Sequence, residues 1–500
     1  MRKRSASISI VTLLLATATA ASCGGNGKSR PSYDPNDTGD LTFDSNGQIV
    51  YQGVNLNMWS VTTGDDAATQ DQIISTFNSL YDGMIHVNVT HTSRYDLEQL
   101  LNTTMQFDRQ SAPDLLFNHG SRAAEYNQRG WILPVDDYFT RSGVNFDKWD
   151  FVPSLLEAVT LDGKAYGMPI DCHSAVVMMR TDILEKNGYQ IPTNYDKLVS
   201  ICDDAAEKAA NNELWIRGDN SSGYAATEWR KASTAEAYTA FPIAYGDMWV
   251  HEFAGYTAAV QNGAKLIDEK GMPAWNSDET ATGLQLLRDW VYATSGAKNK
   301  HPLSKNYGSS YDVGESPFLT GNAIFKLQGP WVYAKDKSDF DSLLRNDGGS
   351  SNITTRSLSS LFAADSGSAD AKKIKGEGHA IMLMSTVESL TKKCAATVFM
   401  DYMAYYSGID WAKRGHLPAA TSVSNSSAYR EDPAYEEYIK YWGDPSDYVV
   451  VEPTVNYSYV DQYFKSALQK SLASDFLSTP VKTILNDEYK DCIAYIQLYS

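Results

Sequence analysis

The sequence predicts an α/β fold, because apolar residues alternate in short runs and then recur at helical spacing through the first part of the chain. Residues 48–59 and 85–89 alternate apolar and polar positions, as half-buried strands do. Between and after them, residues 67–83 and 95–107 place apolar side chains on one helical face, and the short apolar run 113–117 follows. Strand, helix, strand, helix and strand within about 70 residues predict a parallel sheet with right-handed crossovers.

The same alternation continues along the chain. We expect a helix at 121–128 and a second α/β unit that begins near Asp171, with a buried strand at 175–179 and a helix capped by Thr193. Residues 338–376 are rich in Ser, Asp and Gly, which predicts a loop or an irregular insertion. In parallel α/β sheets, ligands bind beyond the carboxyl ends of the strands, so functional residues are expected there.

Length and charge limit the possible functions. The 500 residues are too many for one hydrophobic core, so two lobes are expected. A formal net charge of −18 argues against nucleic acid, whose binding surfaces need clustered Lys and Arg. The 31 Tyr and 11 Trp exceed what a core requires and are typical of surfaces that bind sugars or peptides.

The first residues predict where the protein works. A basic start, an apolar run at 8–21 and small residues before Cys23 are typical of a secretory signal peptide, and the run is too short to span a bilayer permanently. The segment resembles the lipobox of bacterial lipoproteins, which implies a signal peptide at 1–22, lipidation of Cys23 with further acylation such as palmitate, and attachment to the outer face of the bacterial cell membrane. An ordinary secretory leader is the alternative. Residues 23–47 then form a flexible tether.

Most chemical motifs are absent or fail on physical grounds. Residues 25–29 imitate the end of a phosphate-binding loop without the strand it needs, and 34–45 lack the glutamate of a calcium loop. There is no HExxH, GxSxG or zinc-type His/Cys spacing, so we expect no metal and no cofactor. An enzyme stays open at this point, because glycosidase carboxylates would leave no short motif. The remaining cysteines are interpreted as buried thiols or at most one or two disulfides; they are Cys172, Cys202, Cys394 and Cys492.

Four segments combine Gly, Pro and aromatic residues in a distinctive order. They are 112–117 with 130–138, 160–169 with 178–192, 318–325 with Gly329-Pro330-Trp331, and 399–412 with 415–418. Together they resemble the sugar-binding extracellular solute-binding proteins of ABC importers, a family that includes maltodextrin-binding protein. The resemblance implies a two-lobed, periplasmic-binding-protein-like fold that closes about a hinge. It places one lobe at 48–169 plus 333–417 and the other at 170–332 plus 418–500.

The resemblance also implies which residues contact the ligand. Sugar rings present an apolar face and a rim of hydroxyls, so aromatic platforms and polar side chains are both expected. Trp331, in Gly-Pro-Trp, is the leading candidate; the alternative is that its side chain packs in the core. For His173 the alternative is a structural histidine held by hydrogen bonds. Trp411 is assigned to the core. The other candidates are Trp59, Asn118, Ser121, Asp171, Trp229, Tyr245, Asp247, Trp249, Tyr457 and Tyr459.

These observations predict a lipid-anchored, monomeric and non-enzymatic receptor outside the cytoplasm. It would bind a carbohydrate, which we expect to be an oligosaccharide, and would deliver it to the transmembrane subunits of an ABC permease. Two alternatives remain: a lipid-anchored glycan-processing enzyme, and a peptide or polyamine receptor on the same fold. Polyamines would require several carboxylates near aromatic rings, and the segments above offer few beyond Asp171 and Asp247.

Overall fold

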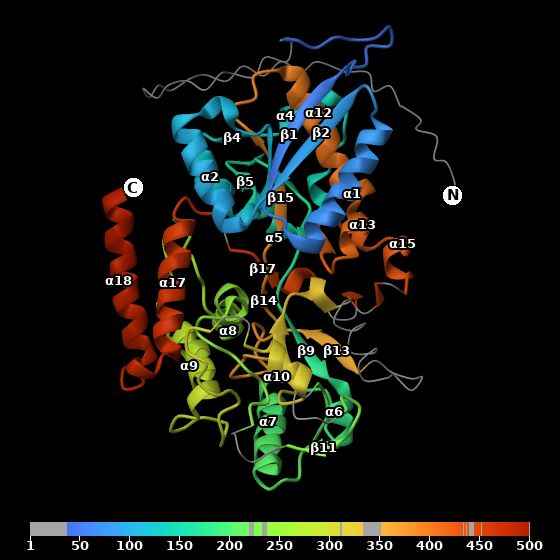
Figure 1. The fold of residues 1–500 in the computed structure, drawn as a ribbon. Coiled ribbons are helices and arrows are strands. Elements are labelled where there is room, and N and C mark those ends of the chain that lie inside the picture. The colour runs from blue at the N-terminus through green and yellow to red at the C-terminus, as the bar shows by residue number, and fades with distance from the viewer. Residues whose placement is uncertain are drawn as a thin grey trace. The chain divides into compact units, whose positions relative to one another are not determined.

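The first lobe is built on a mixed sheet with strand order β2-β1-β3-β15-β4, and β7 pairs with β15 (Figure 1). β1 runs parallel to β2 and β3, in the register Val54↔Ile85 and Met58↔Leu115, which confirms the predicted strand and helix alternation. β15 is antiparallel to β3, because the chain enters it on returning from the second lobe, so the sheet is not wholly parallel. The strands are β1 Val54–Ser60, β2 Ile85–His91, β3 Leu115–His119, β4 Ile132–Leu133, β7 Met168–Pro169 and β15 His379–Met384.

Amphipathic helices cover this sheet on both faces (Figure 1). α1 buries Ile73, Ile74 and Phe77, and the Phe77 ring meets Phe399 of α12 edge-on at 5.0 Å. The apolar residues of α1 recur at helical spacing, so they share the face that packs on the sheet and on α12. The helices of this lobe are α1 Gly64–Leu80, α2 Arg94–Phe107, α3 Ala123–Gln128, α4 Asp136–Ser142, α5 Pro153–Ala158, α12 Leu390–Asp401, α13 Gly408–Ala412, α14 Thr421–Ser424 and α15 Ser427–Arg430.

The second lobe is built on a three-stranded antiparallel sheet, β12-β9-β13. β13 lies inside the segment predicted as a loop, and it pairs with β9 in the register Thr354↔Met179, so that prediction was wrong for residues 353–357. Asn194, and not Thr193, caps α7, since its side chain accepts a hydrogen bond from Lys197 N. The elements are β9 Val176–Arg180, β12 Phe325–Gln328, β13 Ile353–Ser357, α6 Thr181–Lys186, α7 Tyr195–Ala210, α8 Gly255–Gln261, α9 Asp278–Tyr292, α10 Glu315–Thr320, α17 Tyr457–Leu472 and α18 Val481–Tyr499.

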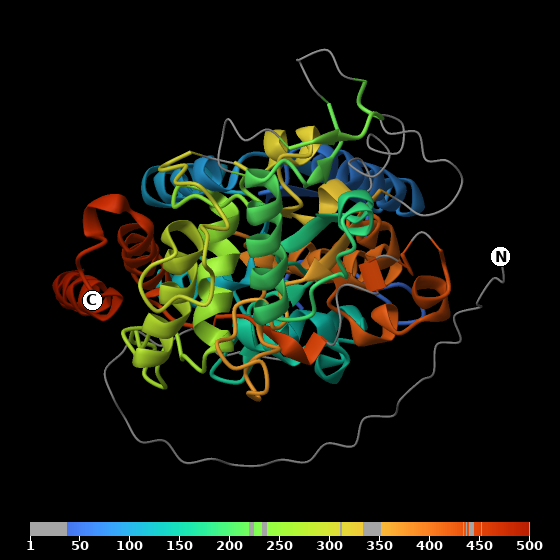
Figure 2. The same cartoon turned by 90° about the horizontal axis from the view of Figure 1, so that it is seen from below.

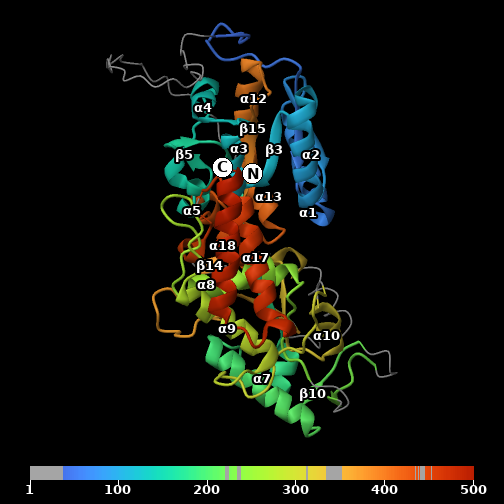
Figure 3. The ribbon, with the colours of Figure 1, turned by 90° about the vertical axis from the view of Figure 1, so that its left-hand side faces the viewer.

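Short strands join the two lobes. The chain passes from β7 through β8 to β9, and returns from β13 through β14 to β15. Figure 3 shows β15 in the first lobe above β14. β8 pairs with β16 and β14 pairs with β17, each over only two residues. In Figure 2 the two C-terminal helices lie side by side at one edge of the second lobe. The remaining strands are β5 Thr160–Leu161, β6 Lys164–Ala165, β8 Asp171–Cys172, β10 Trp215–Ile216, β11 Arg230–Lys231, β14 Ile374–Lys375, β16 Leu417–Pro418 and β17 Tyr448–Val449.

This computed structural model describes residues 38–499, except 220–224, 233–237, 311–312, 334–351, 434, 437, 440–444 and 452. The predicted signal peptide, Cys23 and most of the predicted tether lie outside the described residues. Within the described part, no helix is both long and apolar enough to cross a bilayer. The four cysteines after Cys23 are buried free thiols, which confirms the first of the two interpretations above.

Candidate ligand-binding cavity

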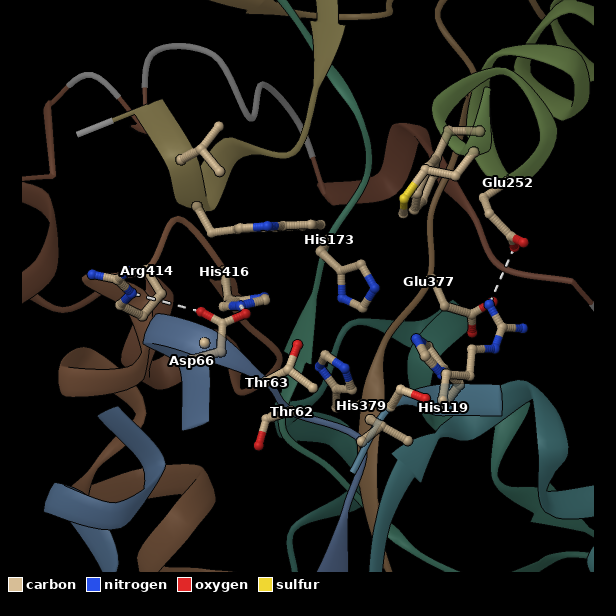
Figure 4. A pocket seen from close by; sticks show the side chains of 18 of the residues that line it. Thr62, Thr63, Asp66, His119, His173, Glu252, Glu377, His379, Arg414 and His416 are labelled. Carbon is tan, nitrogen blue, oxygen red and sulfur yellow. Dashed lines mark hydrogen bonds and ion pairs between the residues drawn. The ribbon is translucent and has the colours of Figure 1, made fainter. Parts of the chain in front are cut away.

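A cavity of about 610 Å³ lies between the lobes, beyond the carboxyl ends of β1, β2 and β3 (Figure 4). Thr62 and Asp66 follow β1, Arg94 follows β2, and His119 ends β3, as expected for an α/β sheet. The joining segments and the second lobe supply the rest of the wall. These residues include His173, Met248, Trp249, Glu252, Phe253, Trp331, Lys375, Glu377, His379, Arg414 and His416.

Two tryptophans form the aromatic wall of the cavity. Trp331 lies in a short turn, Pro330–Val332, that directly follows β12, and its ring is partly exposed. It stacks on His416 at 5.6 Å and 11°, and it meets Trp249 at 5.5 Å. Gly329 permits this arrangement, because a Cβ there would lie 2.4 Å from the Trp331 ring. The Gly-Pro-Trp sequence therefore orients one flat apolar surface at the cavity.

A histidine cluster forms the floor. Asp171, in β8, is fully buried, and its carboxylate lies 3.2 Å from His173 Nδ1, 2.8 Å from His379 Nδ1 and 3.5 Å from His416 Nδ1. The pairing of β8 with β16 brings His416 next to Asp171, and the His173↔Glu377 bridge brings in the start of β15. Asp171 also accepts a hydrogen bond from the indole N–H of Trp411. The ring centroids of His173 and His379 are 4.6 Å apart.

Burial and charge set the protonation of this floor. Burial opposes ionisation of Asp171, but His379 and His416 hold its pKa well below the usual value. Burial lowers the pKa of His173 to about 4, even though Asp171 opposes this shift. The pKa of His416 is raised, because the carboxylates of Asp171 and Asp66 outweigh its burial. At neutral pH the floor therefore combines an ionised carboxylate with a neutral His173.

The other carboxylates of the cavity are each paired with a cation. Arg94 Nη1 lies 3.2 Å from Glu252 Oε2, so this pair joins α2 of the first lobe to the second lobe. Lys375 Nζ lies 3.1 Å from Glu377 Oε2, and it holds the pKa of Glu377 below the usual value against the effect of burial. Arg414 Nε lies 3.6 Å from Asp66 Oδ1. Asp65 also lines the cavity and lies 2.6 Å from Arg414 Nη2, so Asp65 and Asp66 share one guanidinium. Each of these carboxylates therefore has a cationic partner.

Of the residues predicted from the sequence, Trp331, His173 and Trp249 line the cavity. Three others support its wall from behind. Asp171 holds the histidines, Asp247 accepts a hydrogen bond from Trp249 N at 2.9 Å, and Tyr457 Oη lies 3.5 Å from Glu377 Oε2. Trp411 is buried as assigned, although it also donates to Asp171.

The structure places the other predicted residues away from the cavity lining. Asn118 is buried and donates to Glu98 and Tyr126, while the buried Ser121 Oγ has no partner among the described residues. Trp229 lies beneath the guanidinium of Arg217. The residues of this group are Trp59, Asn118, Ser121, Trp229, Tyr245 and Tyr459.

Sequence reasoning missed most of the charged residues of the cavity. The missed lining residues come from six separate segments, and only the tertiary fold brings them together. One pattern could have found the histidines: the chain has only eight, and four of them lie here, each at or beside the end of a strand. The missed lining residues include Thr62, Asp66, Arg94, His119, Glu252, Phe253, Lys375, Glu377, His379, Arg414 and His416.

Solved structures with the same architecture share little sequence with this chain. Maltose-bound MalE3 of T. maritima is 17% identical with a TM-score of 0.63, and the match covers 89% of this chain and 100% of that one. The sugar-binding protein MalE of Xanthomonas citri is 15% identical with a TM-score of 0.67, and the match covers 89% and 99%. At such identities the likeness shows the fold, which is the predicted two-lobed, periplasmic-binding-protein-like architecture with a hinge.

Sequence comparison identifies the family. The maltodextrin-binding protein MdxE of Bacillus subtilis (strain 168) is 23% identical over 271 residues, which are 54% of this chain and 55% of that protein. An uncharacterized ABC transporter extracellular-binding protein of Pyrococcus horikoshii, PH1039, is 24% identical over 127 residues, 25% of this chain and 28% of that protein. The matches thus span about half and about a quarter of these relatives. The family described as bacterial extracellular solute-binding protein matches residues 72–437, and the chain belongs to this family.

Proposed function

We propose that this protein is the substrate-binding component of an ABC importer. In the cavity between its lobes it would bind a carbohydrate, which we expect to be an oligosaccharide. The observation that carries the proposal is that Trp331 and Trp249 form an aromatic wall in a cavity of about 610 Å³ that is also lined by polar and charged side chains. A volume of this size is within the range of small-molecule sites. The aromatic faces suit the C–H surface of a sugar ring, and the polar groups suit its hydroxyls.

The names of similar proteins support a sugar. MdxE is named a maltodextrin-binding protein, MalE3 was solved with maltose, and Lmo0181 of Listeria monocytogenes was solved with cycloalternan. Similar proteins are binding proteins, which favours binding without turnover. We further propose that the protein acts as a monomer and passes its ligand to the transmembrane subunits of a permease.

A cationic solute such as a polyamine is the second candidate, because the fold brings more carboxylates to the cavity than the sequence motifs indicated. Asp66, Glu252 and Glu377 all line it, near Trp331. A polyamine would need these carboxylates free, yet each is paired with Arg or Lys. The pairing favours a neutral ligand whose hydroxyls bind to both partners of such a pair.

Calorimetry of the purified protein against neutral oligosaccharides, peptides and polyamines, with analysis of the products, tests these proposals. We expect a neutral oligosaccharide to bind and to be recovered intact. A hydrolysed product would refute the receptor function, and saturable binding of a polyamine or peptide alone would refute the carbohydrate.

For the lobes we propose the expected boundaries with two changes. β13 pairs in the second sheet, so residues 333 and 352–375 are assigned to the second lobe in place of the first. α14 packs against α13, and α15 packs against α14, so residues 418–430 are assigned to the first lobe in place of the second. The first lobe then holds 48–169 and 376–430, and the second holds the other described residues after 169.

We propose that Cys23 carries the lipid anchor and that 1–22 are removed as a signal peptide. Cys23→Ala should release the protein from the membrane fraction while leaving the calorimetric affinity unchanged. Membrane attachment that survives this substitution would refute the anchor. One acyl chain gives only marginal attachment, so a second acylation of this residue is part of the proposal.

A further inference from the structure

We propose that Asp171, His173, His379 and His416 form a binding site for a first-row divalent metal ion of the zinc class, at the floor of the cavity. Each residue offers one ligand atom, and these four atoms all lie within 4.8 Å of one another. All four side chains are buried. The site goes beyond sugar binding, and its test does not depend on any sugar.

The donor set has the chemistry of a zinc site. Imidazole nitrogen and carboxylate oxygen bind Zn²⁺ at about 2.0–2.2 Å, so the ligand atoms of a tetrahedral ion lie roughly 3.3–3.5 Å apart. The contacts between Asp171 and the Nδ1 atoms of the three histidines already fall close to this spacing, at 3.2, 2.8 and 3.5 Å.

An unpartnered nitrogen points into this cluster. His416 is 1% exposed, and its Nδ1 has no hydrogen-bond partner among the described residues. Its other nitrogen, Nε2, lies 3.4 Å from Asp66 Oδ2. Metal-binding histidines commonly contact a carboxylate with the nitrogen that does not bind the ion, which fixes the orientation of the ring. His416 has this arrangement, with Asp66 on one side and the cluster on the other.

Asp171 is oriented in the same way. The indole of Trp411 and the backbone N–H of His379 both donate to its carboxylate, the latter at 3.0 Å. Hydrogen bonds and ion pairs within the cluster account for these contacts, but they leave the buried Nδ1 of His416 without a hydrogen bond.

The position of the site indicates what the ion would do. His173, His379 and His416 line the cavity (Figure 4). Asp171 is not among the lining residues. Three of the ligands lie in segments that join the lobes: Asp171 in β8, His173 directly after it, and His379 at the start of β15. β16, which follows His416, pairs with β8. The ion would therefore fasten the strands of the hinge together and would lie at the surface that the ligand meets.

Metal binding to the purified full-length protein tests the site. After removal of metal with a chelator and dialysis against Zn²⁺, we expect one equivalent by mass spectrometry and a raised melting temperature. Co²⁺ should give the intense visible absorption of a four-coordinate ion. His379→Gln should abolish stoichiometric binding, and Asp66→Asn should weaken it about 10–100-fold, as loss of an orienting carboxylate does.

His86→Gln is the matched control, because His86 is an exposed histidine of β2 in the same lobe. It should bind one equivalent like the wild type. Circular dichroism checks that each variant is folded; should His379→Gln fail to fold, the Co²⁺ spectrum of the wild type decides alone. Binding of much less than one equivalent by the wild type, a six-coordinate Co²⁺ spectrum, or unchanged binding by folded His379→Gln would each overturn the proposal. Failure to bind sugars would leave these results unaffected, so the two proposals fail separately.

Discussion

Trp331→Ala is the substitution that tests the cavity most directly. A tryptophan contributes about 150–250 Å² of surface, so one face pressed against a ligand hides roughly 100 Å². At about 25 cal/mol per Å² this face is worth about 2.5 kcal/mol, and its removal should weaken ligand binding roughly 60-fold. The fold should suffer less, because the ring is partly exposed and packs mainly on His416 and Trp249. Loss of these aromatic contacts costs about 1–2 kcal/mol of unfolding free energy.

Calorimetry with the tightest ligand of the panel measures the affinity, and chemical denaturation measures the stability. Trp149→Ala provides the matched control, since Trp149 is 94% exposed on the first lobe and should affect neither quantity. An affinity that stays within twofold of the wild type would refute the role of Trp331 as a platform. A loss of stability beyond about 4 kcal/mol, as in large core truncations, would show that the ring belongs to the core.

Two further predictions concern charge. Arg94→Met removes an ion pair that joins the lobes but leaves Glu252 paired with Lys465, so the free energy of contact between the lobes should become about 1 kcal/mol less favourable. Solution scattering should then give a larger radius of gyration, with Arg94→Lys as the control. Identical scattering for Arg94→Met and the wild type would contradict this. Burial raises the pKa of Asp401 to about 6, so the folded protein retains a proton that the unfolded chain has lost, and stability falls as pH rises from about 4 to about 6 and stays lower above it. Asp401→Asn should remove this pH dependence and raise the free energy of unfolding at pH 7 by about 1–2 kcal/mol. This is less than the whole pKa shift would give, because Asp401 is partly exposed. Equal pH profiles of unfolding for the variant and the wild type would contradict this prediction.

Local pattern was sufficient for the first part of the fold. β1, α1, β2, α2 and β3 follow one another, and each shows its own period of two or 3.6 residues, so their order could be predicted. β15 could not be placed in the same way, because an apolar strand buried on both faces reveals neither its partner nor its direction. β13 was hidden for a different reason: its polar sequence, Ile-Thr-Thr-Arg-Ser, resembles a loop until β9 pairs with it.

The site was less predictable than the fold, and the residues that were found show why. Trp331 could be named because its Gly-Pro-Trp motif is local, and the close approach of Gly329 explains that motif physically. Arg94 and Glu252 meet across 158 positions of sequence, and each reads alone as an ordinary surface charge. Asn118, in β3, and Ser121, in the turn that follows β3, lie near the carboxyl end of this strand as expected. Both side chains are nevertheless buried beneath other residues.

The arrangement of the cavity relative to the hinge implies an order of events during binding. The floor lies on β8, on β16, which pairs with β8, and at the start of β15, which the His173↔Glu377 bridge holds beside β8. These segments join the lobes, so we expect the floor to move little when the lobes separate. Trp331 lies on the second lobe, after β12, and the Arg94–Glu252 pair crosses between the lobes. We therefore expect opening of the lobes to separate both of them from their contacts in the first lobe. A ligand can therefore contact the floor while the lobes are apart and gain the Trp331 face only on closure. The Trp331→Ala protein should consequently lose affinity through faster dissociation with an almost unchanged association rate, and stopped-flow kinetics that place the loss in association would reverse this order.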